Sequence, residues 1–262
     1  MKQKITIFSI SFCLFLLCAF SVKAEVYNRD IIVNGDFEDE LNSWDCINCN
    51  EDDNIAYDGY SHYLSLGNLN AEEEAYQTVT VAADAARAHY EFSYDFYTED
   101  SADNDYFTYF VRNHDTQEMY IRETVYPSSG ETWDLPSYSL KAYAGQTLEV
   151  GFIVNNDDDN LTYVQIDNAA LTEKSPARLK ARIISRQYNR VANAKVVIRK
   201  HDGRKVWSGY TNNKGIIIAE DLSADNYHKT AIVITKNGHR KVYRRYIEWG
   251  ESYNKIFKIN LQ

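Results

Sequence analysis

The chain has 262 residues, a formal net charge of −10 at pH 7, 21 tyrosines and 4 cysteines. This length is enough for two domains, and the tyrosine-rich composition favours β-sheet surfaces. Two of the four cysteines lie within the first 24 residues, which excludes a mature fold that depends on several disulfides.

The first 24 residues predict a secretory signal peptide. Lys2 and Lys4 precede an apolar run from Ile5 to Phe20, and the segment ends in Val-Lys-Ala. An uncleaved membrane anchor is the alternative, but the run is shorter than the roughly 20 residues that cross a bilayer, and no second apolar stretch of that length follows. We therefore expect residues 1–24 to be removed and the protein to be secreted or held at the cell surface, without a membrane span.

Cys46 and Cys49 form the C-x-x-C pair of the mature chain. In an exported protein this spacing predicts a local disulfide that closes a tight loop. The alternatives are a zinc site, which needs two further soft ligands, and a redox site in a thioredoxin-like context. The sequence shows neither those ligands nor that context.

From residue 30 to residue 172, short runs of alternating apolar residues are separated by acidic or Asn/Gly/Ser turns, which predicts an all-β domain. The clearest strands place one apolar face in the core, and these faces are Tyr90, Phe92, Tyr94 and Phe96, and Leu148, Val150, Phe152 and Val154. The runs 106–111 and 119–125 carry apolar or aromatic residues on both faces. Such a run either lies entirely in the core or contributes one face to a ligand groove.

Several segments, in this order, resemble the galactose-binding-like jelly rolls, which include the carbohydrate-binding modules attached to bacterial glycoside hydrolases. These segments are Asn34–Glu38, Leu41–Trp44, Trp133, Tyr143–Leu148 with Gly151–Phe152, and Val164–Leu171. The resemblance implies a jelly-roll β-sandwich over residues 25–173, in which the opening segment lies beside the final strand. The same fold also serves adhesion and protein contacts, so the resemblance is more specific for fold than for ligand.

The resemblance also implies a structural calcium ion between the opening segment and the final strand. Asp36, Glu38 and Asp167 would supply carboxylates, and the turn near Asp58 and Ser61 would supply further oxygens. Calcium prefers six to eight such hard oxygen ligands. Without the resemblance, these residues are ordinary surface acids in a strongly acidic domain.

Members of this group bind sugar in a groove across one sheet or at loops on the sandwich edge, and aromatic rings stack on the sugar in both cases. For a sheet groove, the sequence suggests Tyr109, Tyr120 and Arg122, with Glu91 as an added hydrogen-bonding group. For the loops, it suggests Tyr60, Tyr63, Trp133 and Tyr138. The alternative is that each aromatic residue belongs to the core and that Arg122 pairs with a neighbouring carboxylate.

The charge of the mature chain divides near Pro176. Residues 25–175 carry 6 Lys+Arg and 32 Asp+Glu, a net charge of −26, whereas residues 176–262 carry 19 Lys+Arg and 6 Asp+Glu, a net charge of +13. The change indicates a domain boundary at residues 172–176. It allows attraction between the two domains, or between the basic domain and an acidic polyanion such as an acidic polysaccharide or lipopolysaccharide. Nucleic acid would satisfy the same electrostatics, but the export signal argues against it.

Residues 177–262 predict a small seven-stranded, immunoglobulin-like β-sandwich. The predicted strands cover residues 178–184, 194–199, 205–210, 215–219, 228–236, 241–249 and 255–260. A resemblance to carboxypeptidase regulatory-like and transthyretin-like repeats rests on Val191–Ile198, Thr211–Gly215 and Asp221–Tyr227. Asn212 stands where Asp is usual, and the corner at 223–226 lacks proline and glycine. The resemblance implies a non-catalytic spacer or docking domain.

The basic pairs Arg240-Lys241 and Arg244-Arg245 could contact a polyanion, or they could form a solvated or interdomain face. No known catalytic motif is visible, and the six histidines are scattered. The sequence therefore predicts a secreted, non-catalytic protein that binds a polysaccharide or glycan and holds a structural calcium ion. The alternatives are a surface adhesin or extracellular matrix module that recognises protein, and a polysaccharide hydrolase or lyase hidden among many carboxylates.

Overall fold

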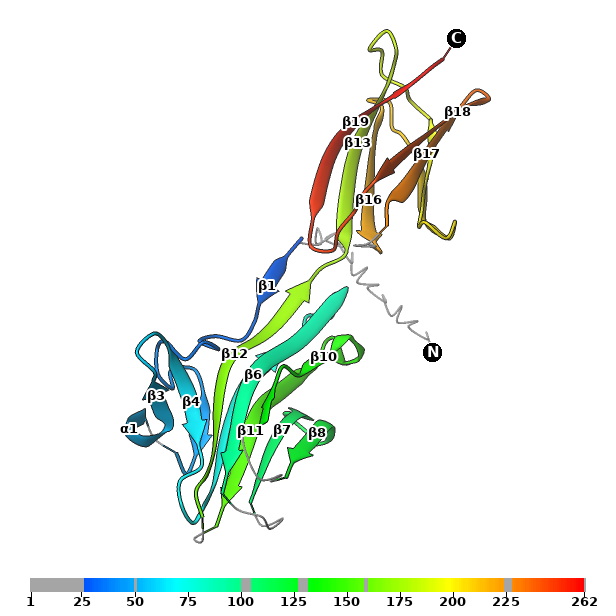
Figure 1. Cartoon of the computed structure of the whole chain (residues 1–262). Coiled ribbons are helices and arrows are strands. Elements are labelled where there is room, and N and C mark those ends of the chain that lie inside the picture. Colours follow the sequence, from blue (N-terminus) through cyan, green and yellow to red (C-terminus); the bar gives the residue numbers. More distant parts are fainter. Residues whose placement is uncertain are drawn as a thin grey trace, which may run out of the picture.

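The structure, a computed structural model, describes residues 26–49, 51–99, 105–126, 132–157, 160–223 and 228–261. The helices in this part are the one-turn α1 (Glu51–Asn54) and the 3-10 turn η1 (Lys141–Tyr143), and neither is long and apolar enough to cross a bilayer. The predicted all-β fold is confirmed. Two separate hydrophobic cores lie in two domains placed end to end (Figure 1). The predicted signal peptide lies outside the described residues.

The first domain is a sandwich of two sheets, here called sheet A and sheet B. Sheet A has the order β10-β6-β12-β4-β3, with β1 added beside β12 and β9 beside β6. Its strands are β1 (Asn28–Asp30), β3 (Ile55–Tyr57), β4 (His62–Leu66), β6 (Arg87–Thr98), β9 (Thr132–Asp134), β10 (Ser137–Ser139) and β12 (Thr162–Lys174). Sheet B has the order β2-β5-β11-β7-β8. Its strands are β2 (Asp45–Ile47), β5 (Ala71–Thr80), β7 (Tyr106–Asn113), β8 (Met119–Val125) and β11 (Thr147–Asn156).

From β5 to β12 the chain passes repeatedly between the two sheets, which is the connectivity of a jelly roll. Burial follows the predicted alternation, because all eight apolar residues of β6 and β11 that were assigned to the core are buried. Aromatic rings join the sheets, and the rings of Phe92 and Phe152 meet edge to face with centroids 4.9 Å apart. Local strand patterns therefore identified the core faces of β6 and β11.

The opening segment lies along β12, as the resemblance implied. Ile31 N–H donates to Leu171 O at 3.0 Å, and Ala169 N–H donates to Gly35 O at 2.8 Å. At Gly35 the two backbones approach so closely that a Cβ would lie 1.8 Å from Ala169 O. Any residue with a side chain would therefore push the opening segment away from β12.

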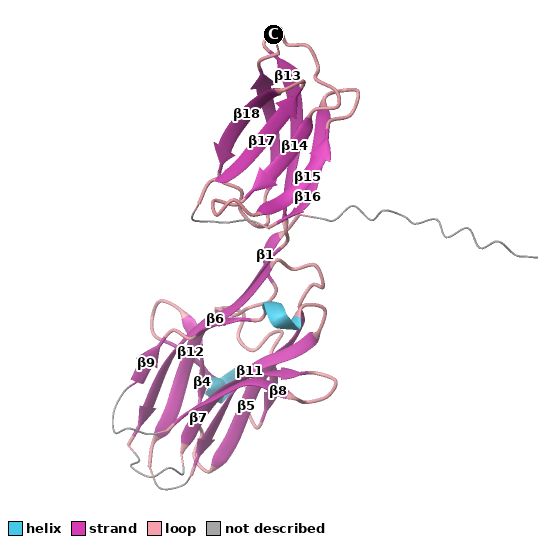
Figure 2. Ribbon diagram, turned by 90° about the vertical axis from the view of Figure 1, so that its right-hand side faces the viewer, coloured by secondary structure: helices cyan, strands magenta, loops and turns pink. Residues whose placement is uncertain are grey.

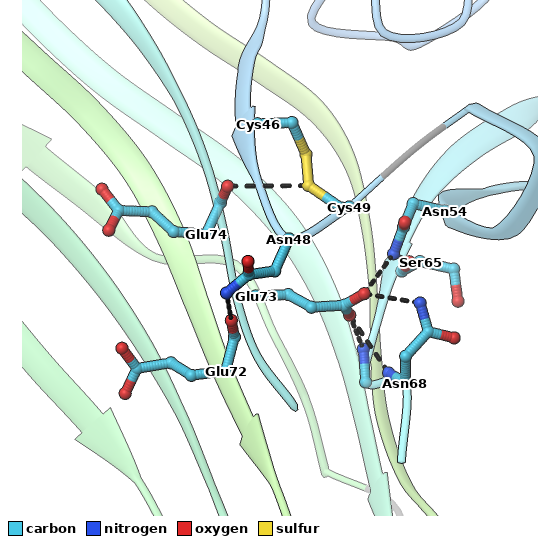
Figure 3. The surroundings of a disulfide bond; sticks show 10 residues. Cys46, Asn48, Cys49, Asn54, Ser65, Asn68, Glu72, Glu73 and Glu74 are labelled. Atoms are coloured by element: carbon cyan, nitrogen blue, oxygen red, sulfur yellow. Dashed lines mark hydrogen bonds between the residues drawn. A yellow bond between two sulfur atoms is a disulfide. The ribbon is translucent and has the colours of Figure 1, made fainter. Parts of the chain in front are cut away.

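The turn after β2 is fastened to the edge of sheet B. Cys46 and Cys49 form the predicted disulfide, with their Cα atoms 5.6 Å apart (Figure 3). Asn48, within this turn, donates from Nδ2 to Glu72 O at 2.9 Å. Because β2 has only three residues in the ladder, these two links hold the segment in register.

The buried carboxylate of Glu73 lies close to this disulfide (Figure 3). Its Oε1 accepts hydrogen bonds from the amide groups of Asn54 and Asn68, and its Oε2 accepts from the backbone N–H groups of Gly67 and Asn68. Four donors compensate for the loss of water around the charge. Glu73 therefore holds α1 and the β4–β5 turn together and is not available to a ligand.

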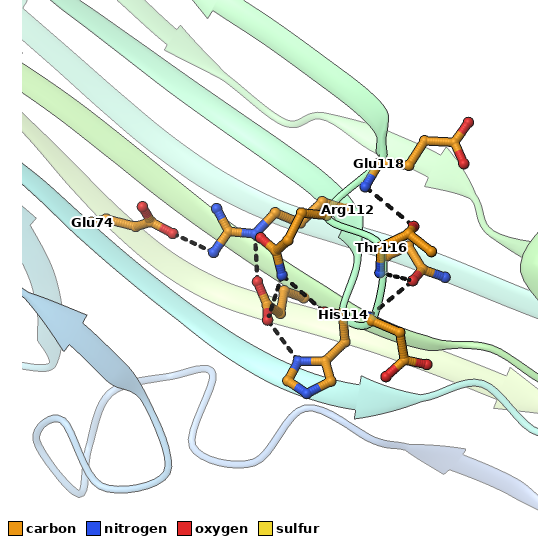
Figure 4. A network of polar contacts seen from close by, with 9 residues as sticks. Glu74, Arg112, His114, Thr116 and Glu118 are labelled. Atoms are coloured by element: carbon orange, nitrogen blue, oxygen red, sulfur yellow. Dashed lines mark hydrogen bonds and ion pairs between the residues drawn. The ribbon is translucent and has the colours of Figure 1, made fainter.

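An ion network covers part of the outer face of sheet B (Figure 4). Arg112 pairs with Glu74 at 2.8 Å and also with Glu149, and His114 Nδ1 lies 2.6 Å from Glu149 Oε1. The Arg112 guanidinium also lies over the ring of Phe110. Burial raises the pKa of Glu149, but hydrogen bonds from Arg112 and His114 outweigh burial and leave this pKa lowered. Arg112 is therefore a counter-charge shared by two carboxylates of this face.

The second domain has seven strands in two sheets, as predicted (Figure 2). Sheet C has the order β16-β13-β19 and sheet D the order β15-β14-β17-β18. The strands are β13 (Ala177–Ser185), β14 (Lys195–Arg199), β15 (Lys205–Tyr210), β16 (Ile216–Leu222), β17 (Thr230–Lys236), β18 (His239–Arg245) and β19 (Ser252–Ile259). The strand predicted at 241–249 ends earlier, at Arg245, because the following residues turn toward the first domain.

Only Ser175 and Pro176 separate β12 from β13. Ser175 N–H donates to Tyr27 O at 3.0 Å, and Gly250 N–H donates to Ser175 O at 2.8 Å. The hydroxyl of Tyr27 also donates to Asp84 at 2.9 Å. The junction is therefore a short, hydrogen-bonded crossing and not a flexible linker.

Replacement of Gly35 by alanine should lower the free energy of unfolding by about 3 kcal/mol, because the new methyl group collides with the backbone of Ala169. Gly59→Ala is the control, since a Cβ there meets nothing within 4 Å and only the φ of +99° is unfavourable. That control should cost about 1 kcal/mol. Urea denaturation measures both, and equal losses would contradict the close approach.

Candidate functional site

The outer face of sheet A carries a hollow of about 260 Å³. Strand register brings its walls together from distant parts of the sequence, since Asp95 of β6 pairs with Trp133 of β9 on one side and with Gln165 of β12 on the other. Gln165 Nε2 then donates to the hydroxyl of Tyr63 on β4 at 3.2 Å. The lining residues are Asp58, Ser61, Tyr63, Ser93, Tyr94, Asp95, Trp133, Gln165, Ile166 and Asp167.

Two aromatic side chains stand on opposite sides of this hollow. Trp133 is 64% exposed, although the indole ring is among the largest apolar surfaces that a side chain can bury. Tyr63 is half-buried on the other side, and Asp95 and Gln165 lie between the two rings. The hollow thus offers apolar ring faces together with hydrogen-bonding groups.

The hollow continues along β6 and β12 toward the opening segment. A second hollow of about 390 Å³ shares Ser93 with the first. A third hollow of about 450 Å³ shares Glu91 and Asn168 with the second. We call the three together the sheet A groove. Its carboxylates are Asp30, Asp36, Asp58, Glu91, Asp95 and Asp167, and no lysine or arginine is among the described residues that line it. The groove is therefore strongly negative.

Four of the five residues predicted to form the calcium site line this groove. Asp58, Ser61 and Asp167 line the first hollow, and Asp36 lines the third. Burial raises the pKa of Asp167, and the negative charges of Asp36 and Glu38 raise it further. The carboxylates from the opening segment and from β12 are therefore close enough to repel one another.

A cation would relieve the repulsion at Asp167, but Glu38 is engaged elsewhere. Its carboxylate accepts the backbone N–H of His62 at 2.9 Å and lies 3.1 Å from His62 Nδ1. These hydrogen bonds, the side-chain one first, lower the pKa of Glu38. Within the described ranges, no three His, Cys, Asp or Glu side chains are grouped to hold a metal ion. The carboxylate oxygens are ligands of the kind that calcium prefers. However, the carboxylate of Glu38 is hydrogen-bonded to His62 and would have to give up these contacts to bind a metal ion.

The predicted sheet groove built from Tyr109, Tyr120, Arg122 and Glu91 is not formed. Glu91 lies on sheet A, where it lines the sheet A groove, whereas the other three residues lie on sheet B. Tyr109 is only 8% exposed, and its hydroxyl is 3.0 Å from that of Tyr138, which is half-buried against the core. These two tyrosines bridge the sheets and cannot both stack on a ligand.

The other two members of that set also have structural environments. Tyr120 stacks on Tyr143 with ring centroids 4.1 Å apart, and its hydroxyl donates to Gln146 Oε1 at 2.7 Å. Arg122 is opposite Phe110 in the β7–β8 ladder, on the outer face of sheet B. Since Tyr109 and Phe110 are consecutive in a strand, their side chains point to opposite faces, and Arg122 points away from Tyr109.

Three of the loop candidates lie at or near the first hollow. Trp133 and Tyr63 both line the first hollow, and Tyr60 is exposed in the turn whose Asp58 and Ser61 line it. Sequence reasoning did not select Gln165 or Asp95 as ligand-binding residues. Alternation in β6 places Asp95 on the outer face. Its position beside Trp133 and Gln165 could not be predicted, because it depends on pairing between strands that are far apart in the sequence.

No protein-family model and no curated protein matches the chain. Among solved structures, TmCBM61 in complex with β-1,4-galactotriose has a TM-score of 0.37 and 16% identity, covering 56% of this chain and 99% of that chain. The K3 cleaved adhesin domain of Lys-gingipain from Porphyromonas gingivalis w83 has a TM-score of 0.39 and 12% identity, covering 55% and 99%. A carbohydrate-binding module, CBM28, specific for non-crystalline cellulose has a TM-score of 0.37 and 9% identity, covering 57% and 98%. Likeness at this level does not define a ligand.

Asp167→Asn should stabilise the protein at about pH 7 in the presence of a chelator. The folded state raises the pKa of Asp167, so ionisation of this carboxyl as the pH rises disfavours folding, and asparagine keeps the side chain neutral. At about pH 3 the wild-type carboxyl is protonated and the two proteins should have the same stability. Urea denaturation at both pH values measures the difference, and a variant that is less stable at neutral pH would refute the repulsion.

Proposed function

We propose that the first domain binds a glycan in the sheet A groove and does not cleave it. The observation that carries this proposal is the exposed ring of Trp133, which faces solvent beside a hollow with Tyr63 on its far side. A sugar ring stacked on the indole would gain about 1–3 kcal/mol from burial of its apolar face. Asp95 and Gln165, which lie between the rings, would accept and donate hydrogen bonds to its hydroxyl groups.

The length of the groove favours a chain of sugar units over a single sugar. The three hollows follow one another along β6 and β12, from Trp133 at one end to Asp36 at the other. A groove that is open along its length accommodates an extended polymer, whereas a closed pocket selects a chain end. The proposed ligand is therefore an internal stretch of a polysaccharide.

The charge of the groove restricts the class of polysaccharide. Six carboxylates line it, and a uronic acid or sulfated sugar would place further negative charge against them. Hydroxyl groups, by contrast, donate well to carboxylates. We therefore assign a polysaccharide without acidic groups to this groove.

Trp133→Ala should abolish detectable retention of the full-length protein on an array of neutral glycans, because the variant loses the exposed stacking surface. Tyr210→Ala, at a residue of the second domain with 65% exposure, is the matched control and should bind as the wild type does. Unchanged binding of Trp133→Ala by a protein that does bind glycans would place the site elsewhere. Release of reducing ends from the same glycans would show an enzyme, and capture of a protein without glycan binding would show an adhesin.

We also propose a structural calcium ion beside the groove, held by Asp167 with Asp36 and Glu38. The support is the repulsion among these carboxylates, which a divalent cation would convert into attraction. Such an ion would require Glu38 to exchange its contacts with His62 for the metal. It would then join the opening segment to β12 at the same place as the backbone contact of Gly35.

Calcium should raise the thermal midpoint of the wild-type protein above its value in chelator, because it binds the folded state alone. Asp167→Asn should lose this gain, since it removes the most buried carboxylate of the proposed site. Asp115→Asn, in the exposed turn between β7 and β8, is the control and should keep the gain. A calcium response that is identical in all three proteins would rule out this site.

We propose an extracellular location from the predicted signal peptide at residues 1–24, which agrees with a C-x-x-C disulfide that persists outside the reducing cytoplasm. For the second domain we propose a non-catalytic spacer or docking role. The support is its short junction, in which Ser175 is hydrogen-bonded to Tyr27 and to Gly250.

A further inference from the structure

The outer face of sheet C combines positive charge with exposed isoleucines. Register places Lys180 beside Ile218, and Arg182 between Ile216 and Ile256. Ile256 is 63% exposed and Ile218 is 45% exposed. Within the described ranges, no carboxylate forms an ion pair with Lys180 or Arg182, whereas Arg178 in the same strand pairs with Glu220. Among the described residues, this face therefore carries cations without ion-pair partners beside apolar side chains that are exposed to water.

A hollow of about 270 Å³ lies on this face, and Lys180, Arg182 and Ile256 are among its lining residues. Exposed apolar side chains next to unpaired cations fit a partner surface that is acidic and partly apolar. A second copy of sheet C does not fit, because it would bring like charges together. The basic residues between Arg240 and Arg245 of β18 are a less suitable docking surface for such a partner, since they alternate between the two faces of an edge strand.

The chain itself supplies an acidic surface, because its first domain has a net charge of −26. The junction prevents this domain from reaching sheet C of the same chain. Ser175 and Pro176 are the whole connection, and Ser175 is hydrogen-bonded to Tyr27 and to Gly250 on opposite sides. The two domains accordingly lie end to end (Figure 1). Charge complementarity between them can be satisfied only by a second molecule.

We propose that the outer face of sheet C docks on the acidic first domain of a second copy, so that two chains pair in antiparallel fashion. Each chain then gives one basic face and receives one, which makes two equivalent contacts and closes the assembly. The second contact forms within an already joined pair, so two weak contacts together give a stable dimer. The pairing does not depend on glycan or calcium binding.

Sedimentation velocity of the full-length mature protein tests this proposal. At about 20 mM NaCl the wild type should have twice the monomer mass, and at about 500 mM NaCl it should dissociate, because salt screens charges in open contacts. Lys180→Glu/Arg182→Glu should weaken dimerisation at least about tenfold. Lys241→Glu/Arg244→Glu changes the net charge equally on exposed residues of β18 and should still dimerise.

Ile256→Asp is a second test of the same face, because it replaces an exposed apolar side chain without removing a cation. Circular dichroism should show all variants folded, since each changed residue is exposed. A wild type that stays monomeric at both salt concentrations would overturn the proposal, as would equal effects of the two double variants. Retention of a monomer on a sulfated polysaccharide column through Lys180 and Arg182 would assign the face to an anionic polymer instead.

Discussion

The close approach of the Gly35 backbone to Ala169 is the contact on which the arrangement of the first domain depends. It holds the opening segment against β12, while β1 pairs with the end of the same strand. Asp36 and Glu38 are thereby brought near Asp167, and the opening segment becomes one wall of the sheet A groove. This backbone contact thus brings together carboxylates that repel one another. Burial, and then the charges of Asp36 and Glu38, raise the pKa of Asp167.

The two outer faces of this sandwich differ in whether their carboxylates have positively charged neighbours. On sheet B, Arg112 pairs with both Glu74 and Glu149, so these two carboxylates share a positive counter-charge. On sheet A, Asp95 and Asp167 line a groove in which the described residues include no lysine or arginine. This contrast supports our proposal that the ligand binds to sheet A. The sequence had suggested mainly sheet B residues for a sheet groove, and Tyr60, Tyr63, Trp133 and Tyr138 for loops.

How far the sequence could lead depended on whether a feature is local. Alternation within β6 and β11 identified the core because successive side chains of a strand point to opposite faces. The same reasoning left β7 undecided between core and ligand groove. Both faces of β7 are buried, since Phe110 is covered by Arg112 while Tyr109 lies between the sheets. No local pattern distinguishes these two situations.

The candidate site illustrates the other limit of local reasoning. Trp133 and Tyr63 could be named from their residue types, but Asp95 and Gln165 become binding candidates only when β9, β6 and β12 are placed side by side. Those pairings join residues separated by tens of positions. The meeting of the opening segment with β12 was expected from a family resemblance, not from the residues alone.

The short junction keeps the acidic first domain and the basic second domain apart. A long flexible linker would let the acidic and basic domains attract each other within one chain, and both the sheet A groove and the outer face of sheet C would be at risk of being covered. Ser175, held by Tyr27 and Gly250, prevents that collapse. The early end of β18 at Arg245 contributes to the same junction, because the chain must turn there for Gly250 to reach Ser175. The junction therefore keeps the negatively charged sheet A groove and the positively charged outer face of sheet C of one chain apart from each other.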